Sequence, residues 1–72
     1  MKIEDIRVGS ILVLKKNNFY EHKSFPIKFL ILREEEIVLS KKEDNFIIYF
    51  DLNKNNINRI RKHWVRDLYE KL

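Results

Sequence analysis

The most restrictive feature of this chain is the pattern of apolar side chains near its C-terminus. Within residues 57–72 they recur at the i, i+3, i+4 spacing that places side chains on one face of a helix. The positions are Ile57, Ile60, Trp64, Val65, Leu68 and Leu72. This pattern predicts a C-terminal helix over about residues 56–71, with Trp64 buried in the core as its anchor.

The opposite face of the predicted helix is basic. It carries Arg59, Lys62 and Arg66, and no acidic residue lies between residues 58 and 66. Such a stripe could follow a phosphate backbone, and the alternative is an ordinary solvated helix face. Arg61 instead falls on the apolar face of the predicted helix. We therefore expect it to extend its charge to solvent, pair with an acid or face a partner.

Size and composition indicate one small folded domain. The chain has 72 residues, of which 44% are hydrophobic and 36% charged, which is too apolar for a disordered chain. A domain of this length buries only about 60% of the surface of its unfolded chain, so its core is either small or shared with a partner. The longest apolar runs, 11–14, 29–32 and 46–50, have the length of strands and not of membrane spans.

Charge and cysteine content restrict the partners and the compartment. The chain has no cysteine, so neither disulfides nor thiolate metal sites are expected, and its opening residues lack the pattern of a secretory signal. We therefore expect a cytoplasmic protein without a membrane segment. The net charge of +4 permits an acidic protein surface or a nucleic acid as partner, and it argues against a mimic of DNA.

Four strands are predicted ahead of the helix, at about residues 10–15, 27–33, 37–40 and 46–50. Gly9 lies where a turn into the first strand needs positive φ. Residues 16–26 are predicted to form a long loop, and Glu34–Glu36 a charged turn between the second and third strands. The last strand is apolar on both faces, which favours a central position in the sheet.

This layout predicts a mostly β fold with a C-terminal α-helix. A strand, a long loop, a three-stranded meander and a closing helix are typical of an SH3-like small β-barrel, which we expect as a single domain over residues 1–72. The alternative is an open α+β antiparallel sheet with one helix across a face. The pattern leaves open whether the helix packs on its own sheet or on another subunit.

Two resemblances add to this prediction. Residues Ile6 to Leu14 resemble the opening of many SH3-like, KOW-like and Tudor-like barrels, in which a hydrophobic residue, Val-Gly and a polar residue precede an apolar strand. The small size, single domain and Lys/Asn/Ile-rich composition resemble those of accessory proteins of phages and other mobile elements. The second resemblance implies an inhibitor, of the kind that anti-CRISPR proteins exemplify, that docks on a host defence or replication factor.

The predicted long loop holds three aromatic residues among polar neighbours, Phe19, Tyr20 and Phe25. We expect Phe19 and Phe25 to fill the open ends of the barrel. Tyr20 has charged and polar neighbours, so we expect it to be exposed, where it could anchor a protein partner or stack on a base.

No catalytic or metal-binding signature is present. His22 and His63 are not joined to a second ligand at helical spacing, and no serine lies in a Gly-x-Ser-x-Gly turn. A single glycine in the whole chain excludes a phosphate-binding glycine-rich loop. We therefore expect no enzyme, no cofactor and no metal.

The sequence predicts a non-enzymatic binding module that docks on a larger protein or a ribonucleoprotein. The alternative is a small barrel that binds DNA or RNA through a basic helix face, and a homo-oligomer is the third hypothesis. The residues expected to carry binding are Arg59, Lys62, Arg66, Arg61 and Tyr20.

Overall fold

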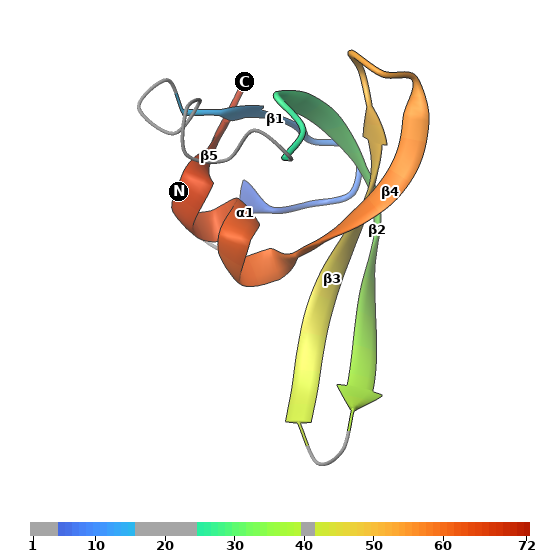
Figure 1. Cartoon of the computed structure of the whole chain (residues 1–72). Coiled ribbons are helices and arrows are strands. Elements are labelled where there is room, and N and C mark those ends of the chain that lie inside the picture. Colours follow the sequence, from blue (N-terminus) through green and yellow to red (C-terminus); the bar gives the residue numbers. More distant parts are fainter. Residues whose placement is uncertain (1–4, 16–24, 40–41) are drawn as a thin grey trace.

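The computed structural model describes residues 5–15, 25–39 and 42–72, which form one five-stranded antiparallel sheet and one short helix (Figure 1). The elements are β1 (Ile11–Leu14), β2 (Lys28–Leu39), β3 (Lys42–Asp51), β4 (Asn56–Arg61), α1 (Lys62–Leu68) and β5 (Tyr69–Lys71). The strand order is β4-β3-β2-β1-β5. A mostly β fold with a C-terminal helix is therefore confirmed, but the sheet is not closed, because β4 and β5 lie at opposite ends of that order.

β2 is one continuous strand where the sequence predicted two strands and a turn at Glu34–Glu36. Residues 34–36 pair with residues 45–47 of β3, so the predicted turn is wrong. Consecutive carboxylates fit a strand because successive side chains point to opposite faces, which separates the charges. Lys62 also compensates one of them, since its Nζ lies 2.6 Å from a carboxylate oxygen of Glu34.

A β-bulge divides β2 into two parts with different neighbours. Ile31 pairs with Tyr49 and Arg33 with Ile48, so Leu32 is the extra residue. A bulge of this kind bends its strand and increases the local twist. The part before the bulge pairs with β1, and the part after it runs beside β3 as a hairpin that extends beyond the rest of the sheet (Figure 1).

The predicted helix over residues 56–71 is wrong in its length, because only Lys62–Leu68 are helical. Residues 56–61 form β4, in which Ile60 is buried opposite Ile47 and Ile57 is 64% exposed. The sequence pattern misled because a strand that enters a short helix can also place apolar residues three and four positions apart. After the helix, residues 69–71 extend again and pair with β1.

Two local features direct the chain into these strands. Gly9, with a φ of 88°, makes the turn before β1 that the sequence predicted. Between β3 and β4, the buried Asp51 Oδ1 accepts hydrogen bonds from the amides of Asn53 and Lys54, at 2.9 and 3.0 Å. Asn55 completes this turn with a φ of 55°, a conformation that asparagine tolerates better than most residues.

The core lies between the sheet and α1. Its buried hydrophobic residues are Ile6, Leu12, Leu14, Phe29, Ile31, Ile47, Tyr49, Ile60, Val65, Leu68 and Tyr69. The Tyr69 hydroxyl donates a hydrogen bond to the Pro26 carbonyl oxygen, which ties β5 to the start of β2. Because Val65 and Leu68 are buried in this core, α1 packs on its own sheet. Trp64 is not the buried anchor that the sequence predicted, since it is 37% exposed.

Candidate functional site

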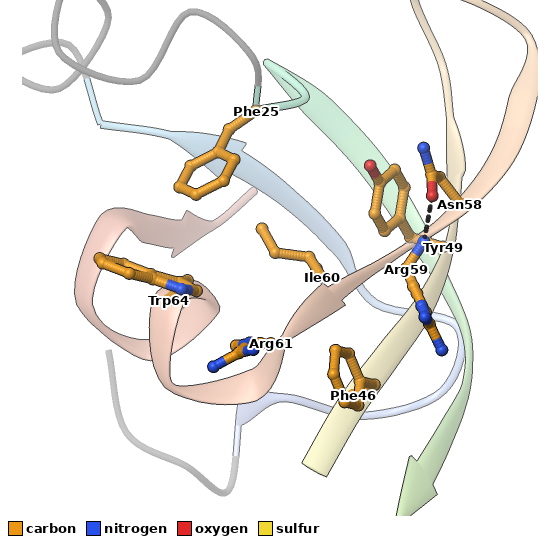
Figure 2. Close-up of a pocket in the computed structure, with 8 residues that line it drawn as sticks. All are labelled: Phe25, Phe46, Tyr49, Asn58, Arg59, Ile60, Arg61 and Trp64. Atoms are coloured by element: carbon orange, nitrogen blue, oxygen red, sulfur yellow. Dashed lines mark hydrogen bonds between the residues drawn. The ribbon is translucent and has the colours of Figure 1, made fainter. Parts of the chain in front are cut away.

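A groove of about 360 Å³ lies where α1 meets β4. Its eight lining residues are Phe25, Phe46, Tyr49, Asn58, Arg59, Ile60, Arg61 and Trp64 (Figure 2). They come from β3, β4, α1 and the residues just before β2, so the groove exists only in the folded chain. Its lining combines aromatic, aliphatic and polar side chains, as ligand-binding sites do.

Aromatic rings form one wall of the groove. The ring centroids of Phe25 and Trp64 lie 5.8 Å apart with a tilt of 53°, and the His63 ring lies 4.9 Å from Trp64 on the same helix. Phe25 packs partly on the core and Trp64 remains partly exposed. These rings therefore offer apolar contact area whose positions are fixed by the fold. Phe19 and Phe25 were expected to fill the open ends of a barrel; Phe19 lies outside the described residues, and Phe25 packs on the core and lines the groove.

Two guanidinium groups flank a phenyl ring on another side of the groove. The Arg59 and Arg61 Cζ atoms lie 5.1 and 5.8 Å from the centroid of the Phe46 ring, within the range of cation–π attraction. Arg61, which fell among the apolar residues of the predicted helix, extends over this ring. These contacts hold both charges at the groove.

The floor of the groove is formed by Tyr49, Ile60 and Asn58. Burial, and secondarily the charge of Asp51, raise the pKa of Tyr49, so its hydroxyl remains protonated at neutral pH. The Asn58 Oδ1 accepts a hydrogen bond of 2.9 Å from the backbone amide of Arg59. This floor supplies polar and apolar contacts, and no titratable group in it is tuned for proton transfer near neutral pH.

The structure separates the predicted basic stripe. Arg59 lies on β4, Lys62 begins α1 and is bound to Glu34, and Arg66 pairs with the neighbouring Asp67 through a 3.0 Å hydrogen bond. That hydrogen bond is the main reason why the pKa of Asp67 is lowered. The three residues therefore do not form one helix face.

Sequence reasoning found part of the groove. Arg59 and Arg61 line it, whereas Lys62 and Arg66 do not, and Tyr20 lies outside the described residues. Phe46 and Asn58 were missed as site residues. A strand assignment for residues 56–61 would have found them, because alternation along that strand places Asn58 beside Tyr49 and Arg61 beside Phe46.

Neither a metal-binding group nor a membrane-spanning helix is found in the described part of the chain. Those residues contain no group of three or more side chains able to hold a metal ion. They also include no helix with the length and apolar character needed to cross a membrane. No family model, no curated protein and no solved structure matches this chain.

Proposed function

We propose that this protein is a non-enzymatic binding module that holds a segment of a partner protein in the groove between α1 and β4. The observation that carries the proposal is the composition of the groove, where Trp64, Tyr49, Arg59 and Arg61 meet around one depression. Trp, Tyr and Arg are the residue types that dominate binding energy at protein interfaces. Trp64, Arg59 and Arg61 are exposed in the folded chain, which supports a contact surface and not only a structural role.

We also propose that the fold is a variant of the SH3-like small barrel. Support comes from the strand order, in which β2, β3 and β4 form a meander and β5 returns beside β1 after a short helix. The β2 bulge also supports it, because bulges bend a strand and a small barrel requires such bends. The resemblance to mobile-element proteins predicts that the partner is a host defence or replication protein or a ribonucleoprotein. This identity stays a prediction.

The test is a selection of random displayed peptides on the immobilised protein, followed by titration of the enriched peptides in solution. Trp64 is the only tryptophan, so its fluorescence reports directly on the groove. We expect enriched peptides to shift its emission and to bind Phe25→Ala about tenfold more weakly, the effect of losing one aromatic contact. Val8→Ala is the matched control, because Val8 is 68% exposed and does not line the groove.

Circular dichroism establishes that both variants are folded before affinities are compared. Equal binding to the wild type and to folded Phe25→Ala would refute the groove as the binding site. A selection that enriches no peptide with groove-dependent binding would refute the proposed function itself.

A nucleic acid is the second candidate, favoured by the two guanidinium groups beside the Phe46 ring. Aromatic rings with neighbouring arginines can stack on bases and attract phosphates. Binding of single-stranded DNA or RNA would weaken steeply with salt and would be lost in Arg59→Glu/Arg61→Glu. Lys62 and Arg66 pair with acidic residues, so the basic surface available to a nucleic acid is smaller than the sequence predicted.

A further inference from the structure

We propose that the outer face of the sheet, which points away from the core, binds an amphipathic helix of a partner protein that carries acidic residues on both sides of its apolar stripe. This inference goes beyond the proposed function, because it concerns a second surface. Three observations support it: an apolar row across the outer face, an arginine on each side of β3 and the position of the cations on β2.

The apolar row crosses three neighbouring strands. Tyr49 of β3 is buried in the core, so alternation along the strand turns its neighbours Ile48 and Phe50 to the outer face. Phe50 pairs with Leu30 of β2 on one side and with Ile57 of β4 on the other. In this row Ile57 is 64% exposed, while Leu30 and Phe50 are half-buried. A contiguous apolar patch on the surface of a small domain indicates a contact surface.

The arginines lie beside the next outward residue of β3. Ile48 pairs with Arg33 of β2 and with Arg59 of β4, so one arginine lies on each side of the strand. Two strand spacings, about 9.6 Å, separate the two positions, which is close to the diameter of about 10–12 Å of a helix with its side chains. A helix along β3 would therefore rest its apolar stripe on the row and place its two flanks beside the two arginines.

Each of these arginines also has a contact within the chain. Arg33 lies 3.6 Å from Glu35 in an exposed ion pair, and Arg59 lies over the Phe46 ring. An exposed ion pair contributes about 1 kcal/mol or less, and a guanidinium has several N–H donors in a fork that fits a carboxylate. A carboxylate of the partner can therefore bind each arginine without displacing the existing contact.

The position of the cations on β2 favours such a helix over a second copy of the chain. Phe29 is buried, so its neighbours Lys28 and Leu30 face outward, and the apolar row lies between Lys28 and Arg33. Two copies packed face to face with aligned strands have their two-fold axis along the strands or along the row. The first arrangement opposes arginines to arginines, and the second opposes Lys28 to Arg33. Like charges repel in both, whereas an acidic flank is attracted.

The test is a display selection with helix-forming peptides of about 15 residues, the length at which isolated helices become stable. Apolar residues are fixed at the i, i+3, i+4, i+7 spacing, and the positions on both sides of this stripe are randomised. We expect the enriched peptides to carry Asp or Glu on both sides. Replacement of these acids by Lys should weaken binding to the wild type at least about tenfold.

Variants of the protein locate the bound peptide. Ile57→Glu places an acid in the apolar row and should weaken binding at least about tenfold, whereas Ile27→Glu is the matched control, since Ile27 is 47% exposed and outside the row. Arg33→Gln should weaken binding about threefold to tenfold. Its matched control is Arg66→Gln, because Arg66 also forms an exposed ion pair and lies on α1. Circular dichroism establishes that each variant is folded.

The outcomes separate this surface from the groove. Phe25→Ala, which alters the groove wall, should bind the enriched peptides as the wild type does. Loss of binding in Phe25→Ala but not in Ile57→Glu would overturn this inference and leave the proposed function standing. Enriched peptides without acids on both sides, or no peptide that depends on Ile57, would also overturn it. Sedimentation should show a monomer, and a dimer that Ile57→Glu dissociates would assign the face to a second copy instead.

Discussion

Two isoleucines on β4 give a sharp test of the fold. Ile57 and Ile60 are three positions apart, and a helix over residues 56–71 would bury both on one face. In the structure Ile60 is 5% exposed and packs opposite Ile47, while Ile57 is 64% exposed opposite Phe50. Truncation of each to alanine removes the same atoms from very different surroundings.

The expected magnitudes follow from burial. Ile60→Ala removes a buried side chain and leaves a cavity, a change that costs about 2–5 kcal/mol in protein cores. Ile57→Ala loses strand propensity and part of a cross-strand contact, which is worth about 0.2–1 kcal/mol. A domain of 72 residues has a total free energy of unfolding of about 4–11 kcal/mol, at 0.05–0.15 kcal/mol per residue. The first substitution therefore removes a large fraction of the stability and the second a small one.

Urea unfolding followed by circular dichroism and Trp64 fluorescence measures both changes. A loss of about 3 kcal/mol for Ile60→Ala corresponds to a fall in Tm of about 12–24 °C in a domain of this size. For Ile57→Ala the fall should stay below about 8 °C. Equal losses at the two positions would refute the assignment of residues 56–61 to a strand and restore the helix that the sequence predicted.

Substitutions at three further contacts test what holds the fold together. Tyr69→Phe removes the hydroxyl that bonds to Pro26 and should cost about 1–3 kcal/mol in urea unfolding. Burial raises the pKa values of Tyr69 and Tyr49, so these hydroxyls lose their protons first in the unfolded state. The free energy of unfolding should therefore fall as pH rises above about 10, and it should fall less steeply in Tyr69→Phe. An equal slope at alkaline pH in both proteins would contradict this. Asp51→Ala removes two hydrogen bonds from backbone amides and should cost about 1–3 kcal/mol. Asp51→Asn keeps an acceptor oxygen and should cost less. Equal losses would mean that the turn does not depend on this acceptor. A double-mutant cycle on Lys62 and Glu34 should give a coupling of about 0.2–1 kcal/mol that weakens in high salt, and zero coupling at low salt would contradict the ion pair.

Strands with apolar runs could be predicted from the sequence, and charged strands could not. The run 46–50 lies within β3, an inner strand of the sheet, and Gly9 makes the turn before β1. Glu34–Glu36 resembled a turn because the sequence does not show that Lys62, far along the chain, lies beside Glu34. A local pattern contains no information about such compensation, so the long β2 strand was divided.

The candidate site could be predicted only in part for a related reason. Arg59 and Arg61 were identified as binding residues by their charge, but their spacing was interpreted on a helix. On a helix, residues two apart diverge by about 200°, whereas on β4 both side chains reach the Phe46 ring. The partners that complete the groove, Phe46 and Phe25, come from parts of the chain that only tertiary structure brings together.

The conformation of residues 56–61 therefore determines the binding chemistry as well as the fold. In a helix the amides of Arg59 and Arg61 would be bonded within the helix. In a strand the Arg59 amide donates to the Asn58 side chain, and both arginines lie on one face of the sheet beside the Phe46 ring. The position of both arginines at the groove thus depends on the strand, so a substitution that disorders β4 should abolish the peptide binding that we propose for the groove.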